Sequence, residues 1–122
     1  MRTVYGEAEQ ISQTYAENSF DLVHAANSLD HSHDPVAAIK AAVRVVKPGG
    51  CVYLEHILNE GDRERYGGLH QWNFGVESNS FTITSKAGRA TNMAEALAGA
   101  GRVTYEIQQG DLTVLLVTIR KI

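Results

Sequence analysis

Hydrophobic positions along this chain form a short run, then a helical repeat, then a second short run. The first run, FDLVHAA at 20–26, is bounded by turn-forming residues and favours a buried strand. Apolar residues from Val36 to Val46 then recur three or four positions apart, as in a helix with one face on a core. The second run, CVYL, occupies 51–54. The pattern therefore predicts a βαβ unit over 20–55, with parallel strands and a right-handed crossover.

The residues at the two ends of this predicted helix support its boundaries. Asp34 can cap the first turn, and Pro35 suits the first helical position because its missing N–H needs no partner there. At the other end Pro48 cannot continue a helix, and the Gly49-Gly50 pair permits a sharp turn. The second strand is expected to start directly after this turn.

The remainder of the chain shows less regular patterning. Residues 56–81 have no clean period and are expected to form an irregular functional cover or a poorly ordered segment. Residues 91–97 look helical, and the apolar segments 103–107 and 113–119 flank a Gln-Gly-Asp turn, which predicts a closing antiparallel hairpin. The expected fold is α/β, a mostly parallel sheet with a C-terminal antiparallel hairpin and helices packed on it.

Composition narrows the classes of partner. The chain of 122 residues carries a formal net charge of −3 with scattered basic residues, which argues against nucleic acid as the main partner. No apolar run approaches the length that spans a bilayer, so no membrane partner is expected. Cys51 is the single cysteine, which fits a reducing compartment, and its apolar context predicts a buried, inert thiol. A cytoplasmic location is the resulting expectation.

Several motifs within residues 4–56 resemble the second half of a class I S-adenosylmethionine-dependent methyltransferase of type 11. They are the FDLV strand at 20–23, the Leu-Asp-His loop at 29–31, the KPGG turn at 47–50 and the acidic Glu55 that follows the next strand. The upstream segment YGEAEQI resembles the third strand of that family. The resemblance implies a Rossmann-like methyltransferase sheet with strand order 3-2-1-4-5-7-6.

The resemblance also implies a cofactor and the residues that would contact it. S-adenosylmethionine is the cofactor of the family. Glu7 and Ala8 hold the positions that meet the adenine ring, and Asn27, Ser28 and Leu29 fall in the loop that lines the methionine part. Intact relatives would transfer a methyl group to an acceptor that the sequence does not identify.

The family's Gly-rich first loop and its ribose-binding acidic residue have no counterpart here. The glycines at 99 and 101 follow a helix rather than a strand, so a helix stop is the better interpretation. We therefore expect residues 1–122 to form one truncated methyltransferase domain, which binds the cofactor weakly or not at all by itself. The strand at 20–26 would lie at an open sheet edge. We expect that edge to be covered by residues 1–6, by a second copy in a homo-oligomer, or by another polypeptide.

Candidate chemistry gathers after the two predicted strands, because ligands of open α/β sheets bind beyond the carboxyl ends of the strands. His31 and His56 are candidate general bases, since imidazole titrates near neutrality. Glu55, His70 and Trp72 are candidate acceptor-binding residues, with the last two in the distinctive stretch GLHQWNF.

Structural roles compete with these functional ones. His31 could serve only to close its loop by hydrogen bonds, and Trp72 could pin the irregular segment to the core through its large apolar area. His24 lies mid-strand and is expected to be a packed core residue, and Tyr53 is expected to be structural.

Two other functions stay open. One is a non-catalytic scaffold, derived from a methyltransferase, that dimerises through its open edge. The other is a small metalloenzyme using His31, His33 and either His56 or His70, with a faint resemblance to dioxygenase and glyoxalase relatives built on antiparallel, curved sheets. No metal site is assigned, because one H-x-H without a further fixed ligand is a weak signal.

Overall fold

A computed structural model describes residues 3–122, in which two sheets and a set of mostly short helices form one α/β unit. The four-stranded sheet contains β1 (Phe20–Ala26), β2 (Val46–Ile57), β7 (Val114–Lys121) and β6 (Gly101–Gln108), in that order. The three-stranded sheet contains β3 (Trp72–Glu77), β4 (Ser80–Ser85) and β5 (Ala90–Asn92). The helical elements are η1 (Ala8–Gln10), α1 (Ile11–Thr14), η2 (Leu29–His31), α2 (Pro35–Val45), α3 (Glu60–Arg63) and α4 (Met93–Ala96).

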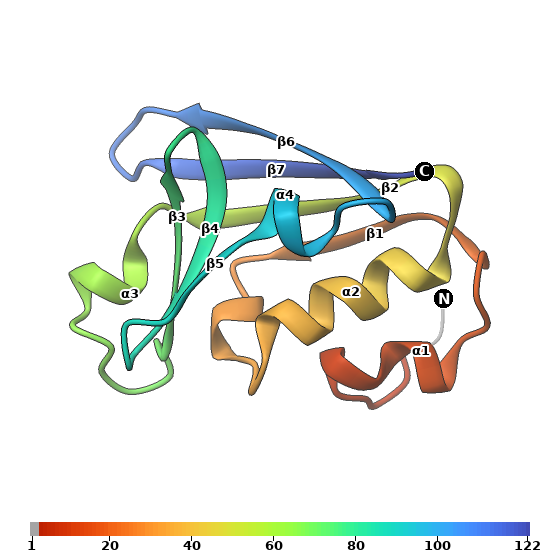
Figure 1. Cartoon of the computed structure of the whole chain (residues 1–122). Helices are drawn as coiled ribbons and strands as arrows, with labels where there is room; N and C mark the ends of the chain where they lie inside the picture. Colours follow the sequence, from red (N-terminus) through yellow and green to blue (C-terminus); the bar gives the residue numbers. More distant parts are fainter. Residues whose placement is uncertain (1–2) are drawn as a thin grey trace.

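The core lies on one face of the four-stranded sheet. Helices α2 and α4 and the three-stranded sheet all cover that face (Figure 1). One hydrophobic cluster joins Leu54 of β2 and Val117 of β7 to Ile39 of α2, Phe81 of β4 and Met93 of α4. A continuous core of this kind holds both sheets together through burial of apolar area.

Strand pairing confirms the predicted topology. Strand β1 pairs with β2 in parallel, and β2, β7 and β6 pair antiparallel in succession. The predicted βαβ unit and closing hairpin are therefore both present. The order β1-β2-β7-β6 equals the 4-5-7-6 part of the order that the family resemblance implied.

The βαβ crossover follows the predicted local chemistry, with one shift of boundary. Oδ1 of Asp34 accepts a hydrogen bond of 3.0 Å from the backbone N–H of Ala37, as an N-cap does. The second strand starts at Val46 rather than after the glycine pair, because Val46 already pairs with Phe20, and the KPGG residues lie in an irregularity between this pair and the next one, Leu22–Cys51. A Cβ at Gly50 would lie 2.7 Å from the backbone oxygen of Asp21, so glycine allows this close approach.

The expectation for residues 56–81 was wrong. This stretch contains α3 and the hairpin of β3 and β4, which pair from Trp72–Ser85 to Glu77–Ser80. Each of the two strands buries three successive residues, so neither shows the alternation by which a half-exposed strand is recognised. The predicted helix at 91–97 is shorter than expected, since Thr91 belongs to β5 and α4 begins at Met93.

The outer face of β1 is exposed, which corrects two predictions. The His24 side chain is 46% exposed and its Nε2 lies 3.3 Å from Oε1 of Glu55, so His24 is not a core residue. Cys51 is half-buried rather than buried, and Tyr53 is half-buried beside His24. Leu22 is 54% exposed. The apolar run 20–26 looked buried on both faces, but within residues 3–122 no element covers its outer face.

Strand β1 also forms an edge of its sheet, as expected. Residues 3–6 form no strand and so do not pair with it, and the first two residues of the expected 1–6 segment lie outside the described part. Elements η1 and α1 pack against α2 instead. In the described range, every helix is too short or too polar to cross a membrane.

Candidate functional site

The carboxyl ends of β1 and β2 meet, as the sequence predicted. Ala26 pairs with Glu55, and the backbone N–H of Asn27 donates a 2.6 Å hydrogen bond to the carbonyl oxygen of Glu55. Asn27 has a φ of 49°, a left-handed conformation that asparagine tolerates better than most residues. The chain turns there and enters η2, which carries Leu29, Asp30 and His31. The parallel pairing thus fixes where this loop lies.

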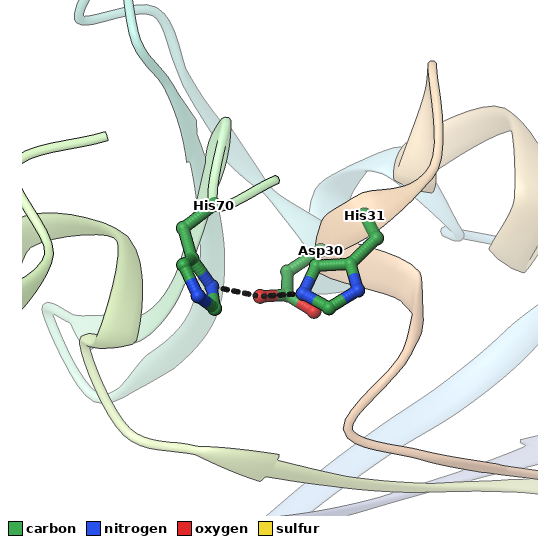
Figure 2. A group of neighbouring side chains, drawn as sticks. All are labelled: Asp30, His31 and His70. Carbon is green, nitrogen blue, oxygen red and sulfur yellow. Dashed lines mark hydrogen bonds and ion pairs between the residues drawn. The ribbon is translucent and has the colours of Figure 1, made fainter. Parts of the chain in front are cut away.

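Asp30 is the centre of a side-chain cluster that sequence reasoning missed. Its Oδ2 lies 3.2 Å from Nδ1 of His70 and 3.6 Å from Nε2 of His31 (Figure 2). Asp30 is only 3% exposed. The only sequence signal for Asp30 was its place between Leu29 and His31 in the loop after the first strand. Its contact with His70 could not be predicted, because 40 residues separate the two in the chain. We call Asp30, His31 and His70 the Asp30 cluster.

The surroundings of the Asp30 cluster are polar on one side. Oε1 of Glu60 lies 3.8 Å from Nδ1 of His70, and the rings of His31 and His70 meet edge to face with centroids 5.1 Å apart. Oδ1 of Asp30 is buried and has no hydrogen-bond partner among residues 3–122. Oδ2 of this carboxylate therefore faces two imidazole rings, whereas Oδ1 contacts no hydrogen-bond donor among the described residues.

His56 lies on the inner face of β2, next to this cluster. It is 3% exposed, its ring centroid lies 4.1 Å from that of Phe74, and its Nε2 has no hydrogen-bond partner within the described residues. Burial lowers the pKa of His56 from 6.5 to about 4, the Asp30 carboxylate opposes this shift, and His31 adds to it. His56 is therefore neutral at pH 7.

A hollow of about 430 Å³ opens beside His31, between η2 and the segment 68–72. Its other lining residues include His33, Leu69, Trp72 and Lys86. This volume falls within the range of small-molecule sites, roughly 300–1,000 Å³. The structure thus brings together His31 and Trp72, two candidates from distant parts of the sequence, on one surface.

The other predicted site residues are more dispersed. Glu7 and Ala8 line a second hollow, of about 330 Å³, together with Tyr5 and Tyr15. Ser28 is exposed, and its carbonyl accepts from the His31 N–H at 3.1 Å.

Glu55 and Leu29 lie apart from the hollow beside His31. Glu55 points to the outer face of the sheet, where it meets His24. Leu29 is half-buried and packs against the core.

The ligand set of the metalloenzyme alternative is not assembled as expected. His33 is exposed and stays outside the cluster, and the group that forms among residues 3–122 is Asp30, His31 and His70. The parallel pairing of β1 and β2 also contradicts the antiparallel, curved sheet on which the dioxygenase and glyoxalase resemblance depends.

Comparison with known proteins agrees with this architecture. The methyltransferase domain family profile matches residues 1–54. The uncharacterized protein YafE of Escherichia coli K12 is 36% identical over 59 residues, which cover 48% of this chain and 28% of YafE. The ubiquinone biosynthesis O-methyltransferase of Hydrogenovibrio crunogenus is 43% identical over 47 residues, 38% of this chain and 19% of that enzyme. The chain therefore matches less than a third of the length of these curated relatives.

Solved structures share the fold over nearly the whole chain. A methyltransferase from Thermotoga maritima, described as a possible histamine N-methyltransferase, aligns with a TM-score of 0.64 at 13% identity, over 98% of this chain and 63% of that one. The [4+2]-cyclase SpnF aligns with a TM-score of 0.62 at 19% sequence identity, over 97% of this chain and 56% of SpnF. The N-methyltransferase NodS of Bradyrhizobium japonicum was solved in complex with S-adenosylhomocysteine. It aligns with a TM-score of 0.58 at 16% sequence identity, over 97% of this chain and 53% of NodS.

The profile match supplies the family relationship for residues 1–54, and the structural likeness extends the fold to the C-terminal hairpin. The strand order supports both. The chain thus has the fold of the class I S-adenosylmethionine-dependent methyltransferases, and its residues 1–54 are similar to a methyltransferase domain.

Proposed function

We propose that this domain takes part in methyl transfer from S-adenosylmethionine to a small-molecule acceptor, with the acceptor held in the hollow beside His31. The observation that carries the proposal is the parallel pairing of β1 and β2, which sets the 27–31 loop at the carboxyl edge of the sheet and next to that hollow. In open α/β sheets this edge is where ligands bind.

The cofactor side of the proposal rests on the 27–31 loop. Asn27 and Ser28 are exposed at the end of β1 and are free to contact the methionine part of S-adenosylmethionine. Glu7 and Ala8 would contact the adenine ring. The bound S-adenosylhomocysteine in NodS supports this choice of cofactor for the fold. The affinity for S-adenosylmethionine is expected to be low, because β1 is an edge strand and the described residues would contact the cofactor from one side of that edge only.

The acceptor side rests on His31 and Trp72. In the transfer, the acceptor heteroatom forms a bond to the methyl carbon while the S–CH₃ bond breaks, leaving S-adenosylhomocysteine. An acceptor that must lose a proton would give it to His31, and the Asp30 carboxylate would stabilise the imidazolium that forms. His31 is better placed for this than His56, because His56 is buried and has a pKa of about 4.

The cofactor proposal is tested by NMR titration of the chain with S-adenosylhomocysteine. We expect weak, saturable shifts centred on residues 27–31 and 7–8. Ser28→Lys should weaken the binding about tenfold or more by placing a bulky charge in the loop, whereas Gln109→Lys, in the distant β6–β7 turn, should leave it unchanged. Shifts confined to other parts of the chain, or no shifts at millimolar ligand, would contradict the proposed site. Binding as tight as micromolar would contradict the expected low affinity.

A non-catalytic scaffold is the second candidate, and the free edge of β1 favours it. SpnF is a [4+2]-cyclase with this fold, so the fold alone does not dictate methyl transfer. The NMR titration with S-adenosylhomocysteine distinguishes the two functions. A scaffold should associate with itself through β1, and its 27–31 loop should show no shifts when this ligand is added. A reducing, cytoplasmic setting fits either function.

A further inference from the structure

We propose that the Asp30 cluster is a binding site for a divalent transition-metal ion, with Zn²⁺ as its best-matched occupant. The inference concerns the same side of the domain as the acceptor hollow, but it does not require cofactor binding. It depends on three ligand atoms, one from Asp30 and one from each histidine, that come within 4.8 Å of one another.

The separations between these atoms suit tetrahedral coordination. Ligand atoms about 2.0–2.1 Å from a tetrahedral Zn²⁺ lie about 3.3 Å from each other. Oδ2 of Asp30 lies 3.2 Å from Nδ1 of His70 and 3.6 Å from Nε2 of His31. The third separation, between the two histidine nitrogens, is within 4.8 Å, and rotation of the imidazole rings would adjust it around a bound ion. Figure 2 shows both rings turned toward the carboxylate.

The buried carboxylate supplies an independent indication that a ligand belongs here. Asp30 is 3% exposed, and its Oδ1 has no hydrogen-bond partner within residues 3–122. A buried carboxylate without full compensation is costly, and a cation is the strongest compensation available. The groups next to Asp30 are imidazoles and the Glu60 carboxylate. Among residues 3–122, no lysine or arginine forms an ion pair with Asp30.

The donor set determines the kind of ion. Two imidazole nitrogens and one carboxylate oxygen suit Zn²⁺, Co²⁺ or Ni²⁺, whereas Mg²⁺ and Ca²⁺ prefer oxygen ligands only. Glu60, with Oε1 3.8 Å from Nδ1 of His70, is positioned to approach as a fourth ligand or to orient a bound water. Three protein ligands with one further position is the arrangement of an open zinc site.

A bound ion would change the role of His31. An imidazole that binds the ion through Nε2 carries its proton on Nδ1 and has no free nitrogen left to accept another, so the base and ligand roles of His31 exclude each other. With the ion bound, an acceptor in the adjoining hollow would meet a Lewis acid instead of a base.

Metal binding by the purified chain, without cofactor, tests the proposal. Equilibrium dialysis of the metal-stripped chain against micromolar Zn²⁺, read by elemental analysis, should give about one ion per chain. Asp30→Asn and His70→Gln should each weaken binding at least tenfold, whereas His33→Gln, an exposed histidine outside the cluster, should not. A large excess of Mg²⁺ should not displace the ion. Absence of binding at micromolar Zn²⁺, or binding that survives both cluster substitutions, would overturn the proposal.

A second measurement keeps the test valid where a variant fails to fold. Zn²⁺ added to the unmodified chain should shift the imidazole NMR signals of His31 and His70 but not those of His24 or His33. Shifts of His33 or His24 alone would show adventitious surface binding and would overturn the assignment. Because no S-adenosylhomocysteine is present, a failure of the proposed methyl-transfer function leaves this result unaffected, and the reverse also holds.

Discussion

Nδ1 of His70 lies 3.2 Å from Oδ2 of Asp30, although 40 residues separate them in the chain. This contact ties the segment between α3 and β3 to the loop that follows β1. It is the only side-chain hydrogen bond within residues 3–122 that joins these two regions. The hollow beside His31 lies between the same two regions.

His70→Ala should loosen the 64–71 segment without unfolding the domain. Loss of a part-buried hydrogen bond to a carboxylate removes about 1–2 kcal/mol of local stability, which corresponds to roughly tenfold faster amide exchange. Hydrogen exchange followed by mass spectrometry should show this change in peptides that cover 64–71. His24→Ala, at an exposed histidine on the outer face of β1, should leave those peptides as they are, and equal acceleration in both variants would show that the contact is unimportant.

Domain stability should fall between pH 6.5 and pH 4 because of His56. Its pKa is 6.5 before folding and about 4 in the buried site, so the unfolded chain binds more protons throughout this window. Protonation therefore favours unfolding as the pH falls, by up to roughly 3 kcal/mol at full effect. Urea unfolding at pH 7 and pH 4.5 measures the difference.

His56→Leu should remove most of this pH dependence, since leucine keeps the apolar contact with Phe74 and does not titrate. His24→Gln, at the exposed face of β1, should retain it. An unchanged pH profile in the His56 variant would mean that other groups dominate the acid sensitivity.

Gly50→Ala should destabilise the domain by about 2 kcal/mol or more through overpacking. The added Cβ would lie 2.7 Å from the Asp21 carbonyl oxygen and 2.7 Å from Cγ1 of Val46, so the β1–β2 pairing would have to shift. Gly6→Ala is the matched control, because nothing lies within 4 Å of a Cβ there. Thermal unfolding compares the two, and equal midpoints would show that the crossover tolerates the methyl group.

Self-association through the free edge of β1 stays a prediction. Unpaired strand edges bind other strands, and the exposed Leu22 adds apolar area at this edge. Light scattering at micromolar concentration should therefore detect a dimer or larger species. Leu22→Lys should shift the population toward monomer, whereas Leu112→Lys, an equally exposed leucine in the β6–β7 turn, should not. A monomeric unmodified chain would contradict the prediction.

The prediction of the βαβ unit and of the C-terminal hairpin was possible because their signals are local. A cap at Asp34, helical spacing of apolar residues and a Gly-rich turn each act over a few residues, and the structure confirms the helix, the parallel pairing and the hairpin. The hairpin of β3 and β4 gave no such signal, because Phe74 and Phe81 lie within runs of three buried residues.

The amino-acid sequence alone determined the βαβ unit, the closing hairpin and the position of the 27–31 loop, since capping, periodicity and turn chemistry depend on near neighbours. The strand order was expected from the family resemblance, and the structure confirms its 4-5-7-6 part. Only the tertiary structure decided which polar groups meet. It buried Asp30 and His56, exposed His24, and placed His70 against a carboxylate from a distant loop. Such contacts arise from the packing of the two sheets against each other, and no short-range pattern encodes which side chains that packing brings together.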